Sequence, residues 1–146
     1  FGVWAGSATE VWVAGGVGTL FRYTGSVISP ITVGATNDLQ AVHGYVTSTG
    51  QTIVYAAGKA GIVVRYAGSP RITTAGTMTH NAVLATPEAV YLVSGGGTVY
   101  KSPGVTDVFT TFNAGSDTLL GIQQAPNGIA WVVGFNGFMG YLDTRP

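Results

Sequence analysis

The sequence predicts an all-β protein built from repeated antiparallel strands, and three observations support this prediction. Glycine supplies 23 of the 146 residues without a Gly-X-Y period, so frequent tight turns explain its abundance. Apolar residues come in short runs bounded by Gly, Ser, Thr, Asn or Pro, which favours strands over helices. One hairpin pattern, VWVAGGVGTLFRY at 11–23, returns three more times along the chain.

The composition excludes several classes of function. Six Lys and Arg residues balance six acids, which leaves no basic surface of the kind that binds nucleic acid. The chain has no cysteine, so disulfides and thiolate metal sites are excluded. Apolar runs are too short for a membrane span, and 146 residues suit one domain. Because Phe1 is already part of a predicted strand, we expect that residues upstream of it were removed or left out.

The four hairpins share a glycine, an aromatic and a cation in matching places. The hairpins cover residues 11–23, 54–66, 90–102 and 130–142. The turns close on Gly18, Gly61, Gly97 and Gly137. The residue pairs Gly95-Gly96 and Asn136-Gly137 also tolerate the positive φ that a tight hairpin turn requires. The strand before each turn carries Trp12, Tyr55, Tyr91 or Trp131, which we expect to pack between repeats. The strand after it carries Arg22, Arg65 or Lys101, and Tyr141 in the fourth copy.

Further strands flank each hairpin. Shorter apolar strands are predicted before the hairpins, at Gly2–Ala5, Ala41–Gly44, Ala82–Ala85 and Gly121–Gln124. More polar strands are predicted after the first three, at Val27–Val33, Arg71–Thr74 and Val108–Phe112. Four antiparallel strands in about 40 residues make a β-propeller blade. We therefore predict a single β-propeller domain or fragment of about four blades, over residues 1–38, 39–80, 81–118 and 119–146. A β-solenoid has shorter rungs, and a β-sandwich does not need one hairpin four times.

This count leaves the predicted propeller incomplete. Fifteen strands are predicted where four complete blades need sixteen, and the fourth blade lacks its outer strand. The chain is then a fragment of a larger propeller, a small four-bladed ring, or a partial ring that another chain completes. An open propeller exposes apolar faces and an unpaired edge, which is why one of these explanations is needed. Because Phe1 is not a start residue, we favour the fragment or the intermolecular completion.

Three stretches resemble known propeller repeats. KSPGVTDVFTTFNAGSDTLLGI at 101–122 resembles the Asp-box of bacterial neuraminidases, with Ser102, Gly104, Thr106 or Asp107, and Phe109 in the places of its conserved residues. Residues 119–144 resemble the repeat of photosystem II assembly and stability factors, and residues 1–25 are similar to repeats of secreted bacterial propellers. This superfamily includes assembly factors, glycosidases, lectin-like domains and surface or virion proteins, so the resemblance implies a fold and several possible roles.

The candidate site residues form two groups. Arg22, Arg65 and Lys101 form a cationic row that suits carboxylates or phosphates. Turns and connections gather on one propeller face, where binding usually occurs, and there we expect Asn37, Asp38, Lys59, His80, Asp117 and Asn136. His80 is placed in a connecting loop and His43 on an inner strand, and their separation argues against a zinc site. The acids are scattered singly, so no catalytic residue is assigned.

These features predict a non-catalytic propeller module that mediates binding or assembly, in an extracellular, cell-surface or virion-associated setting. The expected partner is a protein, a glycan or a second copy that completes the ring, with no cofactor, metal, nucleic acid or membrane span. Two alternatives remain open. One is an Asp-box-type glycoside hydrolase or carbohydrate-binding domain, and the other is a purely structural, self-associating propeller.

Overall fold

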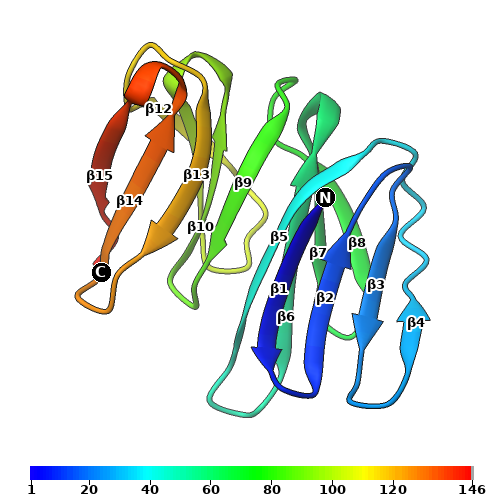
Figure 1. Ribbon diagram of the computed structural model, residues 1–146. Helices are drawn as coiled ribbons and strands as arrows, with labels where there is room; N and C mark the ends of the chain where they lie inside the picture. The colour runs from blue at the N-terminus through cyan, green and yellow to red at the C-terminus, as the bar shows by residue number, and fades with distance from the viewer. Residues whose placement is uncertain (146) are drawn as a thin grey trace.

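The computed structural model describes residues 1–145 and confirms the predicted fold class (Figure 1). The described chain is all-β, with four antiparallel sheets that follow one another in chain order. In each sheet the strands also lie in chain order, as in the blades of a propeller. Within residues 1–145, no helix is long and apolar enough to cross a membrane.

The fifteen strands found in residues 1–145 have the following bounds. The first sheet contains β1 (Gly2–Ser7), β2 (Glu10–Ala14), β3 (Leu20–Tyr23) and β4 (Ile28–Pro30). The second contains β5 (Leu39–Val46), β6 (Thr52–Gly58), β7 (Ile62–Tyr66) and β8 (Pro70–Thr74). The third contains β9 (His80–Ala85), β10 (Ala89–Ser94), β11 (Thr98–Pro103) and β12 (Thr110–Asn113). The fourth contains β13 (Leu119–Gln124), β14 (Ile129–Gly134) and β15 (Met139–Asp143).

Two predicted elements differ from the structure. The outer strand expected over Val27–Val33 is shorter in the structure, where it covers only β4, with one further backbone hydrogen bond from the Ile31 N–H to the Leu20 carbonyl at 2.8 Å. His80 does not lie in a connecting loop but begins β9, where its side chain is buried. Apart from His80, each predicted blade range contains the strands of one sheet.

The sheets stack face to face, and side chains between them form the core. The innermost strands β1, β5, β9 and β13 pack against one another in that order. Three clusters of buried apolar residues lie between successive sheets. Figure 1 shows the first and fourth sheets at the two ends of this array. Each inner sheet therefore buries both faces, which explains why its central strands are apolar along their whole length.

The repeated aromatic shows where stacking stops. Trp12, Tyr55 and Tyr91 are 0%, 0% and 3% exposed and face the following sheet, as predicted. Trp131 has the same position in the fourth sheet but is 45% exposed, so the prediction that it packs between repeats is wrong for the described chain. No fifth sheet follows it within residues 1–145.

The hairpin turns explain the repeated glycines. Each turn has two successive residues with positive φ, as in type I′ hairpin turns. The pairs are Val17-Gly18, Ala60-Gly61, Gly96-Gly97 and Asn136-Gly137. The predicted pair Gly95-Gly96 is therefore shifted by one residue, since the turn's positive φ values fall on Gly96 and Gly97. Three of these turns carry the labels η1 (Lys59–Gly61), η2 (Gly95–Gly97) and η3 (Phe135–Gly137), but the positive φ of their central residues is not helical.

Close backbone approach adds a second requirement for glycine in the first three turns. A Cβ on Gly61 would lie 2.1 Å from the carbonyl oxygen of Gly76, and a Cβ on Gly97 1.9 Å from that of Gly115. Those carbonyls belong to the segments that lead to the next sheet. A Cβ on Gly137 would meet no atom of the described structure within 4 Å. A turn is thus crowded where the chain continues past it to a following sheet, and it is open where no following sheet is described.

We expect Gly61→Ala to destabilise the protein more than Gly137→Ala. Both variants place alanine at nearly the same positive φ, +72° and +74°, which costs about 1–2 kcal/mol. Only Gly61→Ala also forces a clash with backbone, for an additional cost of about 1–3 kcal/mol. Urea unfolding of both variants measures the difference. Equal losses of stability would contradict the proposed role of close approach.

Candidate binding surfaces

The first member of the cationic row is held within its own sheet. The Arg22 guanidinium donates to both carboxylate oxygens of Glu10, with Nη2 2.9 Å from Oε2. Its Cζ lies 5.6 Å from the ring centroid of Trp12, whose Nε1 also donates to Glu10. The hydrogen bonds that Arg22 donates to Glu10 raise the pKa of Arg22. Arg22 is thus engaged by a carboxylate and an aromatic ring. Lys101 lies over an aromatic ring in the same way, with Nζ 5.5 Å from the ring centroid of Tyr91.

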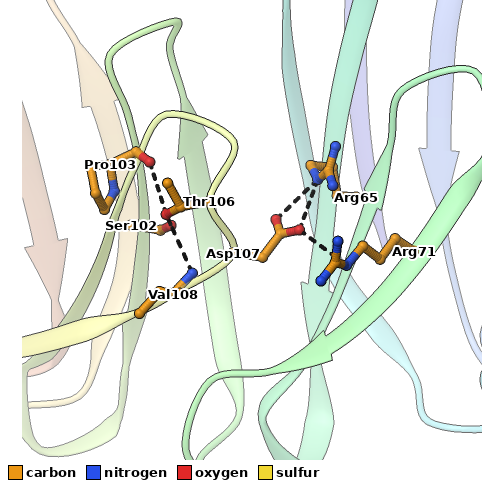
Figure 2. Close-up of polar contacts among 7 residues, drawn as sticks. All are labelled: Arg65, Arg71, Ser102, Pro103, Thr106, Asp107 and Val108. Atoms are coloured by element: carbon orange, nitrogen blue, oxygen red, sulfur yellow. Dashed lines mark hydrogen bonds and ion pairs between the residues drawn. The ribbon is translucent and has the colours of Figure 1, made fainter.

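The second member, Arg65, joins the second sheet to the third. Its Nε donates to both oxygens of Asp107 at 3.0 Å, and Arg71 Nε lies 3.5 Å from Asp107 Oδ2 (Figure 2). Only 3% of the Asp107 side chain is exposed. One buried carboxylate therefore bridges two arginines of the neighbouring sheet and fixes the β11–β12 loop against it.

The β11–β12 loop has its own polar network, which Figure 2 shows beside the arginine cluster. Thr106 Oγ1 donates to the Pro103 carbonyl at 3.0 Å and lies 3.1 Å from Ser102 Oγ. Asp107 has a φ of +59°, an uncommon conformation that aspartate tolerates better than most residues. These bonds hold the loop in the conformation that directs Asp107 toward Arg65.

A pocket of about 430 Å³ lies beside this cluster, between the second and third sheets. It is lined by Tyr45, Thr47, Gln51, Ile53, Arg65, Ala67, Pro87, Gly104 and Val105. Nearby, the buried Tyr55 hydroxyl has no hydrogen-bond partner in the described structure. Burial raises the pKa of Tyr55 above its ordinary value, so this hydroxyl stays neutral at physiological pH.

The predicted turn-face residues pair with one another locally and do not gather into one site. Asp38 forms an ion pair of 2.6 Å with Lys59 and accepts a hydrogen bond from the Val17 N–H at 3.0 Å. The hydrogen bond from Lys59 lowers the pKa of Asp38. Asn136 Nδ2 donates to Asp117 at 2.8 Å. Asn37 is exposed, and its carbonyl accepts from the Gly18 N–H. Each pair ties a connecting segment to a hairpin turn.

The two histidines are structural. His80 is buried, with Nδ1 2.7 Å from Ser94 Oγ and its ring edge-on to Tyr100. Burial lowers the pKa of His80, and the nearby backbone groups of Ala75 and Gly61 raise it by less than burial lowers it. His80 Nε2 is buried and has no hydrogen-bond partner in the described structure. His43 Nδ1 accepts from an N–H of the third sheet, and burial lowers its pKa as well. In the described part of the chain, no cluster of three or more His, Cys, Asp or Glu side chains could hold a metal.

The fourth sheet presents an open apolar face. Trp131 and Val133 of β14 and Met139 and Tyr141 of β15 are exposed on or beside it. The corresponding residues of the first three sheets, such as Leu20, Val63 and Val99 for Met139, are buried against the following sheet. We call this surface the trailing face.

The first sheet presents the opposite kind of face. Val3 of β1 and Val13 of β2 are exposed on the side away from the second sheet. In the other sheets the residues at the place of Val3 are Val42, Val83 and Ile122, and all three are buried against the preceding sheet. We call this surface the leading face.

Comparisons with known proteins bear on the fold alone. No family model matches the chain, and no curated protein matches it. The chain is similar to the crystal structure of the computationally designed Ika4 protein, with a TM-score of 0.74 at 17% sequence identity. The similarity covers 99% of this chain and 90% of that one. The whole four-sheet array thus corresponds to a solved architecture.

The sequence predicted exposed apolar end faces for an open propeller, because the first and last copies of a stacked repeat each have one unmatched face. It did not place Trp131 on such a face, and it missed the contact of Arg71 with Asp107. No local sequence pattern predicts the ion pair of Arg71, because its partner Asp107 lies 36 residues further along the chain and belongs to another sheet.

We expect Asp107→Asn to destabilise the fold by about 1–3 kcal/mol, because two arginines lose a charged acceptor. Asparagine tolerates the positive φ, so the variant changes charge more than backbone conformation. Urea unfolding measures the loss. Asp143→Asn is the matched control, since its exposed ion pair with Arg145 should leave the midpoint unchanged. Equal effects of both substitutions would contradict a structural role for the Asp107 bridge.

The buried histidines predict a loss of stability in mild acid. Their pKa values are lowered from 6.5 in the folded state, so below about pH 6.5 the unfolded chain binds more protons than the folded one. The free energy of unfolding should therefore fall below pH 6.5, by up to about 1.4 kcal/mol per pH unit for each histidine. Urea unfolding at pH 7.5 and 5.5 tests this. A His80→Asn variant with an undiminished pH dependence would overturn the assignment to His80.

Proposed function

We propose that this chain is a non-catalytic β-propeller module whose role is assembly through its leading and trailing faces. The observation that supports this most directly is the exposure of Trp131. Three residues at its repeated position are buried between sheets, whereas Trp131 presents a large aromatic surface to solvent. A side chain placed by the repeat for burial against another sheet is suited to a contact with another polypeptide.

The chemistry of both faces supports an interface. Trp131, Met139 and Val133 on the trailing face, and Val3 and Val13 on the leading face, are uncharged and exposed. Burying one such side chain contributes about 1.5–3 kcal/mol, so contiguous exposed groups give a strong drive for association. Trp and Met are also enriched at protein interfaces.

The placement of the acids supports a non-catalytic role. Glu10, Asp38, Asp107 and Asp143 each form an ion pair with a lysine or arginine. A glycoside hydrolase of the common type instead needs two carboxylates facing one another across a cleft. The charged side chain that lines the described pocket is Arg65. The resemblance of residues 101–122 to an Asp-box, and a location outside the cytoplasm, remain predictions.

We expect the two open faces to bind an environment-sensitive apolar dye in a dilute solution of the monomer. The double variant Trp131→Lys, Met139→Lys should lose binding to the trailing face, and Val3→Lys, Val13→Lys should lose binding to the leading face. Fluorescence titration at nanomolar protein measures both. Val108→Lys is the control, because Val108 is exposed but belongs to neither end sheet.

Dye binding that none of these variants changes would contradict the proposal. A second contradiction would be hydrolysis of a chromogenic glycoside above the uncatalysed rate that disappears in a carboxylate variant such as Glu88→Gln. Circular dichroism shows whether each variant retains the wild-type fold.

A further inference from the structure

We infer that the partner of each open face is a second copy of this chain, which binds head to tail so that two copies close an eight-bladed ring. This inference rests on the proposed function, since it names the occupant of the same two faces. The trailing face of one copy contacts the leading face of the other, and the reverse contact closes the ring on the opposite side.

The trailing face matches surfaces that the chain already buries. Trp131 stands at the place of Trp12, Tyr55 and Tyr91, and Val133 stands at the place of Ala14, Ala57 and Val93. The earlier members of both sets lie in the clusters between successive sheets. What covers them in each case is the leading side of the next sheet. The same kind of surface therefore fits the trailing face.

The leading face provides that surface. Val13 stands at the place of Ala56, Leu92 and Val132, each of which is buried against the trailing side of the preceding sheet. Within one chain, each of the three clusters contains a residue equivalent to Val133 from one sheet and a residue equivalent to Val13 from the next sheet. Ala14 and Ala56 are such a pair in the first cluster, and Val93 and Val132 are such a pair in the third. A second copy that brings Val133 to Val13 repeats a packing that the chain has already made.

The direction of the contact follows from this equivalence. Every internal contact joins a trailing side to a leading side, so a contact between two leading faces or two trailing faces would have no counterpart in the chain. Contacts between unlike faces form rings when the rotation between copies closes. Head-to-tail pairing of two copies satisfies both faces of both chains.

The number of copies follows from the number of sheets. Propellers typically have about 4–8 blades. One copy supplies four sheets and leaves both end faces open in the described structure, whereas two copies supply eight. Three copies would exceed the usual range. A closed pair is therefore the solution that covers the open faces within known propeller sizes.

The test uses two variants that each damage one face. Val13→Glu places a charge on the leading face, and Val133→Lys places one on the trailing face. Alone, each should weaken self-association at least about tenfold, because an unpaired charge is buried in both contacts of the pair. Mixed together, the two variants form one wild-type contact and one Glu–Lys contact, so association should be restored. Sedimentation velocity measures the masses, with Val108→Lys as a control that associates like the wild type.

The expected wild-type particle has twice the mass of one chain, and the mixture of variants gives the same mass. A wild-type chain that stays monomeric at all concentrations overturns the inference, as does a mixture of variants that remains monomeric while each variant keeps its fold. A monomer that still binds dye through both faces separates this failure from a failure of the proposed function, because the faces then remain open to a different polypeptide.

Discussion

The structure depends on burying both faces of each sheet against a neighbouring sheet. Four strands that are apolar on both sides cannot form a stable unit alone, and the three clusters between sheets supply the burial. Within a sheet, backbone hydrogen bonds fix the order of strands, but the apolar side chains between sheets fix how sheets follow one another. The same constraint explains the two exposed faces, where the repeated core continues without a neighbour.

Polar groups determine how neighbouring sheets are held in register. Asp107 joins the third sheet to Arg65 of the second, and Asp38 joins the first turn to Lys59 of the second. Segments between sheets pass so close to the turns that Gly61 and Gly97 leave no room for a side chain. Charged residues are few in this sequence, and five of them, Asp38, Lys59, Arg65, Arg71 and Asp107, form ion pairs at the junctions between repeats.

Much of the fold could be predicted because its determinants are local and repeated. Alternating turn glycines and apolar runs located the strands, and the recurrence of Trp12, Tyr55 and Tyr91 identified the side chains between sheets. The structural exceptions have physical causes. His80 belongs to a strand because its ring pairs with Ser94 in the core, a contact that no sequence pattern indicates. The exposure of Trp131 follows from the absence of a fifth sheet in residues 1–145, which is a property of the array and not of the local sequence.

Hydrogen exchange at increasing protein concentration is the most direct measurement of the central claim that contact between sheets protects each sheet. The account predicts that amides of β2 and β14, in the two end sheets, become better protected as concentration rises. Amides of β6 and β10, which are already enclosed on both sides, should show no change. Protection of β2 and β14 that does not depend on concentration and equals that of β6 and β10 would contradict the account.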